Sequence, residues 1–489
     1  MLTALVLATR IATLFLTSAN LGPDEAQYWY WSRTLDLGYF SKPPMIAWAI
    51  AFTTTLFGHE EWAVRLSAPF FHAGAAGFLF LLSRRLFDAT TAFWTAAGWL
   101  FLPGVALSSF VITTDAPLLF FWCAGLYLVF DLAERSETGA PTVPRAGIFG
   151  AVIGLAFLAK YAALYFIAAG ALAAFVDPRI RRVFLGRAGA AAGGAFATCA
   201  ALNVWWNAQN DFQTVGHTAE NANWGASLLQ PLSLLEFWAG QLAVFGLMAP
   251  LAIWAFFLWR RRRDPRRTDL LVLLVFALTP LLIVSVQAFI SRAHANWAAS
   301  AYPAAILLVA HILTAHGHGR ALKRAVALHG AAALAFCIAM VNFGLIDRVG
   351  ASGAIREIRG WDRQTEAIAA RASGFDAVMI DDRGLLGEML YYQREAMIAV
   401  VAWDPNARVS NHYEAFIPFD PDRQSRVLFV TTRDDDAHVN YRFTDIMSLG
   451  PLAANGEGET AKTRRSFHLF DVSGYTPPPS VVETRSSAR

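Results

Sequence analysis

The sequence predicts a mainly α-helical protein: a polytopic transmembrane helical bundle followed by a small C-terminal α/β domain. Composition is the first observation, since 56% of the 489 residues are hydrophobic, 16% are charged and the mean hydropathy is +0.40. These values lie well away from the averages of soluble proteins. The second observation is a change at Asp347, where apolar segments give way to a mixed, charged tail. We therefore expect a membrane domain over 1–346.

Windows of about 17–25 apolar residues are long enough to cross the hydrocarbon core of a bilayer. Arg10 lies in the middle of the first window, so either it faces the bundle interior or the sequence starts within a longer first helix. That window lacks a small-residue cleavage site, and we expect no cleavable signal peptide. About eleven spans are predicted, at approximately 2–20, 64–83, 89–109, 115–131, 146–160, 162–177, 188–206, 236–258, 269–289, 297–315 and 325–346.

The connections between these spans alternate sharply in charge. One set holds only Arg33, Lys42, Lys160 and Arg292. The other set holds Arg84, Arg85, Arg135, Arg145, Arg179, Arg181, Arg182, Arg187, the run Arg260 to Arg263, Arg266, Arg267, Arg320, Lys323 and Arg324. Positive residues stay inside, so the richer set is cytoplasmic and the poorer set lies on the outer face of a multi-pass membrane protein. The net charge of +3 is too small to suggest nucleic acid as a partner.

With an odd number of spans, the tail from 347 then also lies on the outer face. Strand-like runs at Ala377–Ile380, Met397–Ala402, Val427–Thr432 and Phe467–Val472, with a helical run from Leu385 to Gln393, predict an α/β domain over 347–475. Residues 476–489, rich in Pro, Ser and Arg, are expected to be disordered. Asp381 and Asp382 follow the first strand, where we expect a helix cap and keep a ligand site as the alternative.

The C-terminal tail shows none of the common short nucleotide-binding or catalytic motifs. There is no GxGxxG, P-loop, HExxH or GxSxG pattern. The cysteines, Cys123, Cys199 and Cys337, fall inside apolar spans, without CxxC or Cys/His metal spacing. We predict no metal ligands from these patterns.

The most informative segment follows the first span and runs from Gly22 to Trp31. It places Asp24 and Glu25 before a run of four aromatic residues, with two residues in between, at the point where a membrane helix should emerge. Aromatic rings suit the membrane boundary, whereas ionisable groups beside the bilayer are costly unless a cavity or a partner holds them. We expect a functional site here. The alternative, which does not exclude chemistry, is that Asp24 caps a helix beginning near Ala26.

Three further charged residues fall on the same predicted face. Lys42 precedes two prolines, which force an extended backbone, and it could meet a phosphate or reach the headgroups by snorkelling. Lys160 within an apolar region costs about 3 kcal/mol unless a phosphate or a carboxylate pairs with it. Asp115 opens the fourth span as a predicted N-cap, which explains it structurally, and it shares the outer face with Asp24.

Mixed aromatic and amide segments complete the candidate site. Trp206 ends the seventh span and Asn207 begins the outer loop after it, while Arg292, His294 and Asn296 precede the tenth span. Aromatic faces cover the C–H surfaces of sugars and amides satisfy hydroxyl groups, although an interfacial aromatic belt explains the same composition. Tyr28 and Tyr39 of the first outer loop join these residues as candidate substrate-binding side chains.

These residues resemble those of the GT-C superfamily of membrane glycosyltransferases. The match is to the bacterial group (family 39/83-like) of protein mannosyltransferases and aminoarabinose-to-lipid A transferases. It covers roughly 1–345 and is specific to the superfamily but not to a substrate. The matching segments are Asp24 to Trp29, Lys42-Pro43-Pro44, Thr114 to Leu118, Gly154 to Tyr161, Trp206 to Asp211, Asn296-Trp297 and Tyr302-Pro303.

The resemblance implies a polyprenyl-phosphate sugar as donor and transfer on the periplasmic face. The acceptor would be lipid A, lipopolysaccharide core, another envelope glycan or a protein. It also implies that Asp24 lies near the acceptor nucleophile, with Asp115 beside it, and that Lys42, with Lys160 or Arg292, meets the donor phosphate. Aminoarabinose transferases commonly have a glutamate where this chain has Ser41, which puts a metal site there in doubt. No cofactor is implied for certain, and a divalent cation stays possible.

A polytopic transporter or a flippase for lipid-linked sugars is the competing class. Such proteins usually show internal repeats and helices interrupted by Gly or Pro in corresponding halves. The sequence has no convincing repeat, and its buried charges gather on one face. A non-catalytic envelope scaffold is the third class. We therefore predict a glycosyltransferase in which Asp24, supported by Glu25, orients or deprotonates the acceptor.

Overall fold

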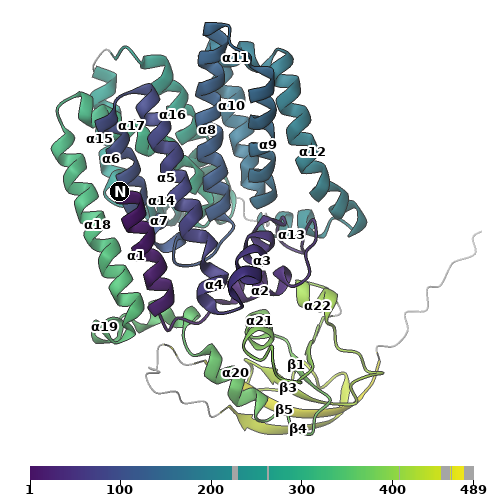
Figure 1. Cartoon of the computed structure of the whole chain (residues 1–489). Coiled ribbons are helices and arrows are strands. Elements are labelled where there is room, and N and C mark those ends of the chain that lie inside the picture. Colours follow the sequence, from purple (N-terminus) through teal and green to yellow (C-terminus); the bar gives the residue numbers. More distant parts are fainter. Residues whose placement is uncertain (223–228, 262–263, 407, 453–462, 464, 478–489) are drawn as a thin grey trace, which may run out of the picture. The chain divides into compact units, whose positions relative to one another are not determined.

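The computed structural model describes the chain except residues 223–228, 262–263, 407, 453–462, 464 and 478–489 (Figure 1). The predicted disordered tail thus lies almost wholly outside the described residues. Two compact units are present. The membrane unit comprises Met1–Ser18 and Trp31–Leu345, and the α/β unit comprises Ala19–Tyr30 and Ile346–Arg489. Residues 19–30, which hold the Asp24-Glu25 motif, therefore fold with the tail.

The membrane unit is helical (Figure 1). Short 3₁₀ turns, η1 (Tyr161–Ala163) and η2 (Ala295–Ala301), precede α10 and α17. The α-helices are α1 (Leu2–Leu16), α3 (Met45–Phe57), α4 (Glu61–Arg65), α5 (Ser67–Leu86), α6 (Ala89–Phe101), α7 (Pro103–Ser108), α8 (Asp115–Thr138), α9 (Val143–Ala159), α10 (Leu164–Val176), α11 (Pro178–Phe184), α12 (Arg187–Gln209), α13 (Gln213–Ala222), α14 (Pro231–Phe245), α15 (Met248–Arg261), α16 (Arg267–Ile290), α17 (Tyr302–Ala315) and α18 (Gly319–Val341).

Within the described residues, five helices are long and apolar enough to cross a membrane, or up to seven if each of two bent helix pairs is one span. A polytopic helical membrane protein is therefore confirmed, while the count of eleven spans stays a prediction. The core of the unit is apolar, and Trp99, Trp122 and Phe276 are fully buried in it.

Two predicted spans are broken in the structure. The span at 89–109 divides at Leu102, because Pro103 lacks an N–H and begins the new helix α7. The span at 236–258 bends by 96° at Gly246, whose φ of +59° suits glycine. The freed backbone N–H of Leu247 donates to Nε2 of His329 at 2.9 Å. A buried histidine thus accepts the hydrogen bond of the backbone N–H that the break leaves without a helical partner.

Close packing of α9 on α12 organises the neighbourhood of Lys160. A Cβ on Gly150 would lie 2.0 Å from the carbonyl oxygen of Ala192, and one on Gly154 would lie 2.5 Å from Cβ of Cys199. Glycines spaced four residues apart let two membrane helices approach this closely. The two helices therefore have a fixed register relative to each other.

The α/β unit contains a five-stranded sheet in the order β2-β1-β3-β5-β4. β1 pairs in parallel with β2 and β3, and β5 pairs antiparallel with β3 and β4. The strands are β1 (Ala377–Ile380), β2 (Val400–Ala402), β3 (Arg426–Thr431), β4 (Phe443–Pro451) and β5 (His468–Tyr475). The four predicted strand regions and the helix after the first strand are confirmed. β4 was missed because most of its side chains are at least partly exposed and give no apolar run.

Among the described residues, six helical segments lie wholly or partly in the α/β unit. They are α2 (Pro23–Ser32), α19 (Phe343–Arg348), η3 (Ser352–Ile358), α20 (Trp361–Ala369), α21 (Arg383–Tyr392) and α22 (His412–Phe416). Helix α2 begins in the α/β unit and ends in the membrane unit, whereas α19 begins in the membrane unit and ends in the α/β unit. Asp382 caps α21, accepting from the backbone N–H of Leu385 at 2.7 Å, as predicted. Asp381 instead accepts from Thr431 at 3.0 Å and contacts His438 Nδ1 at 2.6 Å.

Candidate active site

A buried ion pair forms the centre of the candidate site in the membrane unit. Lys160 Nζ lies 2.7 Å from Asp115 Oδ1, and Asn296 Nδ2 donates to Asp115 Oδ2 at 2.8 Å. The side chains of Lys160 and Asp115 are 18% and 8% exposed. The three residues come from the end of α9, the start of α8 and the 3₁₀ turn η2. Both carboxylate oxygens are therefore held, from two directions.

The predicted N-cap role of Asp115 is wrong. Thr114 holds the cap position, and Asp115 is the first residue of α8 with its carboxylate directed to Lys160. A lysine in an apolar region needs a partner, because an uncompensated buried charge is strongly unfavourable. The carboxylate of Asp115 is that partner, and its negative charge compensates the positive charge of Lys160.

Tyr161, which follows Lys160 in the chain, joins a hydrogen-bond network with two asparagines of α12. Tyr161 donates its hydroxyl to Asn203 Oδ1 at 2.6 Å, and Asn207 Nδ2 donates to the Asn203 carbonyl at 3.0 Å. Asn203 Nδ2 donates in turn to the carbonyl of Leu37 at 2.8 Å. Asn203 was not among the predicted site residues. Its position one helical turn before Asn207 was the signal in the sequence, since residues four apart share a helix face.

The first loop is fastened to this network by its aromatic residues. The ring of Tyr39 stacks on Trp31 with centroids 4.8 Å apart, and its hydroxyl donates to the Trp31 carbonyl at 3.1 Å. A Cβ on Gly38 would lie 2.5 Å from the ring of Trp206. Tyr39 and Trp206 are both buried, so in this structure they shape the loop that carries Lys42. The Lys42 carbonyl accepts from the Tyr39 backbone N–H at 3.1 Å, which closes the turn.

The segment between α16 and η2 presents exposed polar groups. Arg292 and His294 are exposed, and the ring of His294 meets the edge of Trp297 at 5.4 Å. Gln287 Nε2 donates to the carbonyl of Arg292 at 3.3 Å. Asn296, two residues after His294, reaches Asp115. This segment therefore combines one contact to the buried ion pair with an exposed guanidinium group.

The Asp24-Glu25 motif lies on α2 in the α/β unit, and Asp24 is not a helix cap. The helix begins at Pro23, so Asp24 belongs to its first turn. Glu25, which is buried, accepts from the backbone N–H of Gly22 at 3.0 Å and takes the capping role. Asp24 Oδ1 accepts from Arg383 Nη2 at 2.9 Å, and Gln27 Oε1 accepts from Nη1 of the same arginine.

Arg383 was missed by sequence reasoning, because nothing in a sequence links positions so far apart. Burial acts against the charged form of Arg383, but the charge and hydrogen bond of Asp24, together with smaller contributions from Tyr413 and Tyr28, outweigh it and raise the pKa of Arg383. The aromatic residues after Asp24 also belong to this unit. Tyr28 and Trp29 are buried, and Trp29 meets the edge of Tyr391 at 4.9 Å.

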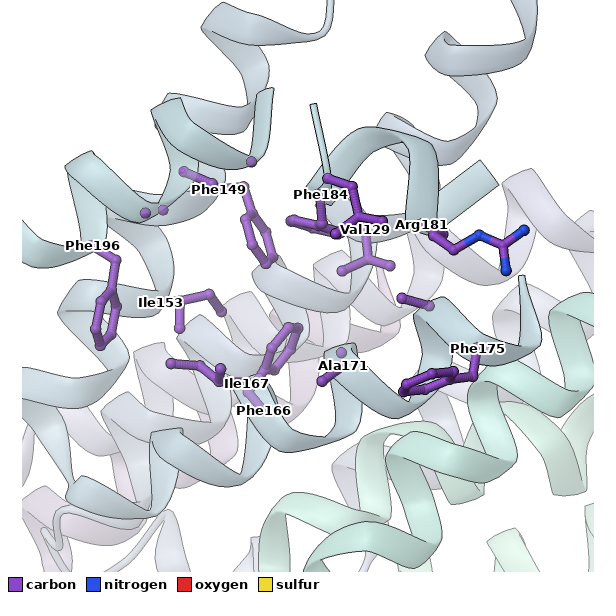
Figure 2. A pocket seen from close by; sticks show the side chains of 17 residues that line it. Val129, Phe149, Ile153, Phe166, Ile167, Ala171, Phe175, Arg181, Phe184 and Phe196 are labelled. Atoms are coloured by element: carbon purple, nitrogen blue, oxygen red, sulfur yellow. The ribbon is translucent and has the colours of Figure 1, made fainter. Parts of the chain in front are cut away.

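A large apolar cavity of about 560 Å³ lies among α8, α9, α10, α11 and α12 (Figure 2). Its lining includes the aromatic rings of Phe149, Phe166, Phe184 and Phe196. Arg181 is the charged residue among the residues that line it. Ile153, which also lines the cavity, precedes Lys160 by seven residues on α9, or about 10 Å of helix. Among the described residues, no group of three or more His, Cys, Asp or Glu side chains could hold a metal ion.

Comparisons with known proteins agree with the motifs. A family model described as dolichyl-phosphate-mannose-protein mannosyltransferase matches residues 41–206. Lipid A galacturonosyltransferase RgtD of Rhizobium johnstonii is 34% identical over 431 residues, which cover 86% of this chain and 88% of that protein. An undecaprenyl phosphate-α-4-amino-4-deoxy-L-arabinose arabinosyl transferase of Shewanella sediminis is 29% identical over 150 residues, 28% of this chain and 27% of that protein.

Solved structures share the fold. Crystal structures of ArnT from Cupriavidus metallidurans, one in the apo state and one bound to undecaprenyl phosphate, each superpose with a TM-score of 0.65 at 16% identity. The superpositions cover 95% of this chain and 96% of those chains. Together with the relative that is 34% identical over most of its length, these matches confirm the resemblance. The chain belongs to the GT-C superfamily of membrane glycosyltransferases.

Proposed function

We propose that this glycosyltransferase moves a sugar from a polyprenyl-phosphate donor to lipid A on the periplasmic face of the inner membrane. The observation that carries the proposal is the Asp115–Lys160 ion pair with Asn296, at the ends of apolar helices. A donor linked to a lipid brings its phosphate to that depth without any nucleotide-binding loop. The relative named as a lipid A galacturonosyltransferase supports galacturonic acid as the sugar and lipid A as the acceptor.

The donor phosphate is assigned to the cationic side chains of the membrane unit. Lys160 is held by Asp115, Lys42 lies in the turn closed by Tyr39, and Arg292 is exposed beside η2. Cations that face a leaving phosphate stabilise the negative charge that develops on it. Trp206, Asn207, His294 and Asn296 are proposed to contact the sugar, with Tyr28 and Tyr39.

The polyprenyl chain is assigned to the apolar cavity of Figure 2. Its lining is almost entirely hydrocarbon and aromatic, which suits an isoprenoid and not a sugar. Ile153 lies on α9 and Lys160 directly follows the last residue of this helix, so a lipid lying along α9 would have its phosphate near Lys160 and its tail in the cavity. This arrangement supports a lipid-linked donor over a soluble one.

Asp24 is proposed as the general base of the transfer. A hydroxyl oxygen of the acceptor attacks the anomeric carbon, the bond from that carbon to the phosphate oxygen breaks, and polyprenyl phosphate leaves. The hydroxyl proton passes to the Asp24 carboxylate, a contribution of about 10²–10⁴ in rate. Glu25, buried against Gly22, supports the helix turn that presents Asp24. Asp115 is proposed to hold Lys160 in position.

The charge asymmetry of the sequence supports the periplasmic orientation. The proposed count of about eleven spans requires that short apolar helices combine in pairs to form complete spans. The α/β unit would then be periplasmic. Ser41, where aminoarabinose transferases commonly have a glutamate, argues against a divalent cation held at that position.

Mass spectrometry of envelope lipids from strains with and without the gene tests the proposed product. Lipid A carrying one additional hexuronic acid residue should be present only with the gene. Identical lipid A in the two strains, with a changed core oligosaccharide or glycoprotein, would reassign the acceptor. Identical envelopes throughout would favour a flippase or a scaffold.

A further inference from the structure

We propose that Arg383 is a positioning residue for sugar transfer, which holds the Asp24 carboxylate in one orientation. This inference rests on the proposed role of Asp24 as the base. It assigns the α/β unit a part in the reaction: the unit carries the reacting carboxylate and the arginine that orients it.

The segment around Asp24 is built into the α/β unit by backbone and side-chain contacts. The backbone N–H of Asn20 donates to the carbonyl of Ile358 at 3.0 Å, and its Oδ1 accepts from the backbone N–H of Trp361 at 3.0 Å. The backbone N–H of Leu21 donates to the hydroxyl of Tyr392 at 2.9 Å. Asp24 therefore keeps a fixed relation to the sheet and helices of this unit.

Helix α21 brings Arg383 to Asp24 with little freedom. Arg383 is the first residue of α21, directly after the cap Asp382 and close to the end of β1. A Cβ on Gly384 would lie 3.4 Å from Pro23, and one on Gly387 would lie 3.4 Å from Ala26. Small residues on α21 thus allow α2 to pack directly on it, which places the two first turns together.

The guanidinium group has two anchors. Nη2 donates to Asp24 Oδ1 at 2.9 Å, and Nη1 donates to Gln27 Oε1. Gln27 follows Asp24 by three residues on the same helix face, so its contact holds the guanidinium group beside the carboxylate. The hydrogen bond to Oδ1 then favours one orientation of the carboxylate. Within the described residues, Asp24 Oδ2 accepts no hydrogen bond. That oxygen is available to the acceptor hydroxyl.

Exposure argues that this pair does not serve stability. The side chains of Arg383 and Asp24 are 45% and 63% exposed, and ion pairs of this kind contribute about 0–1 kcal/mol to folding. A substrate can therefore reach the pair. Orientation of a reacting group is worth far more, since a displacement of about 1 Å can cost about 10² in rate.

The test compares Arg383→Met and Arg383→Lys in the full-length protein with a matched control, Arg426→Met. Arg426 belongs to the same unit and pairs with Asp471 at 2.6 Å, with 55% of its side chain exposed. We expect Arg383→Met to lower kcat about 10²-fold while the KM for the undecaprenyl-phosphate sugar and the unfolding temperature stay unchanged. Arg383→Lys should restore part of kcat, and Arg426→Met should keep all of it.

A double-mutant cycle with Asp24→Asn separates this inference from the proposed function. If Arg383 acts through Asp24, Arg383→Met should cause no further loss in the Asp24→Asn background. Full kcat in Arg383→Met, with Asp24→Asn inactive, would overturn the role of Arg383 alone. A rise in donor KM without a fall in kcat would assign Arg383 to anion binding and overturn positioning. An active Asp24→Asn protein would overturn the base itself. If Arg383→Met fails to fold, Arg383→Gln replaces it with the same expectations.

Discussion

At the scale of single residues, two ion pairs hold charged side chains of the candidate site. Lys160 pairs with Asp115, and Asp24 pairs with Arg383. The sequence could predict that Lys160 needed a phosphate or a carboxylate, because burial of a lone charge is unfavourable. It could not predict which carboxylate, since 45 residues separate Asp115 from Lys160. Arg383 is more distant still, and only the fold reveals it.

The Asp115–Lys160 pair gives a stability prediction. Lys160→Met leaves the buried carboxylate of Asp115 without its charge partner, which should lower the free energy of unfolding by about 3–5 kcal/mol. Asp115→Asn in addition should recover much of this loss, because the amide carries no charge. Thermal unfolding in detergent measures both variants. Lys323→Met is the control, since Lys323 lies over the ring of Trp94 at 5.5 Å. Equal stability of Lys160→Met and wild type would contradict the buried pair.

At the scale of elements, the hydropathy pattern located helices better than it located their ends and breaks. Helix α3 was missed because 13 residues are too few for a span. The break at Gly246 was missed because the capping contact from His329 is 82 residues away in the chain. Strand β1 was predicted at its observed bounds, since a short, fully buried strand is a continuous apolar run. Patterns of burial are thus visible in a sequence, and long-range polar contacts are not.

The apolar cavity gives a prediction at this scale. Gly193 lines it, and a Cβ there would meet nothing within 4 Å. Gly193→Leu should fill the cavity and raise the donor KM about tenfold, equivalent to losing the burial of about two methylene groups. Unfolding temperature should not change. Gly150→Ala is the contrasting variant, since its Cβ would collide with Ala192, and it should cost about 1–3 kcal/mol of stability. An unchanged donor KM in Gly193→Leu would exclude the cavity as the tail site.

Helix α22 gives a prediction of pH dependence. Burial lowers the pKa of His412 to about 3, and its ring stacks on Phe416 at 4.3 Å. Because the folded pKa lies below the unfolded value of about 6.5, the unfolded state binds the proton more tightly. The contribution of the buried, neutral His412 side chain to folding stability is therefore complete above about pH 6.5 and is lost as the pH falls toward 3. Between pH 7 and pH 5, the loss should be about 2 kcal/mol.

Hydrogen exchange of peptides that cover 412–416 measures this local stability. His412→Asn removes the titrating group, so its protection should depend less on pH over the same range. Identical pH dependence in the variant and the wild type would assign the effect to other groups of the unit.

At the scale of the whole molecule, the family and the glycosyltransferase activity were predictable, whereas the organisation into units was not. Motifs that are weak singly specified the superfamily because they occur together in order, and the relatives confirm it. The clustering of residues 19–30 with the C-terminal tail was not predictable. It depends on hydrogen bonds such as that from Leu21 to Tyr392, which no local pattern encodes.

Membrane orientation is tested on the intact protein by cysteine labelling. Single cysteines at Glu220, Arg266 and Arg423 would be exposed to a thiol reagent that does not cross the membrane, after replacement of the three native cysteines. Since basic connections stay in the cytoplasm, we expect labelling at 220 and 423 in spheroplasts and none at 266. The reverse pattern would invert the proposed topology.

The central claim is that the protein consumes a lipid-linked sugar and hands that sugar to an acceptor. The most direct measurement supplies undecaprenyl-phosphate galacturonic acid and lipid A to the purified protein in nanodiscs, and follows both products by mass spectrometry. Wild type should release undecaprenyl phosphate and form lipid A with one added sugar in equal amounts, while Asp24→Asn should do neither above a hundredth of that rate. An intact donor in the presence of folded wild-type protein, across donors that carry galacturonic acid, aminoarabinose and mannose, would contradict the account.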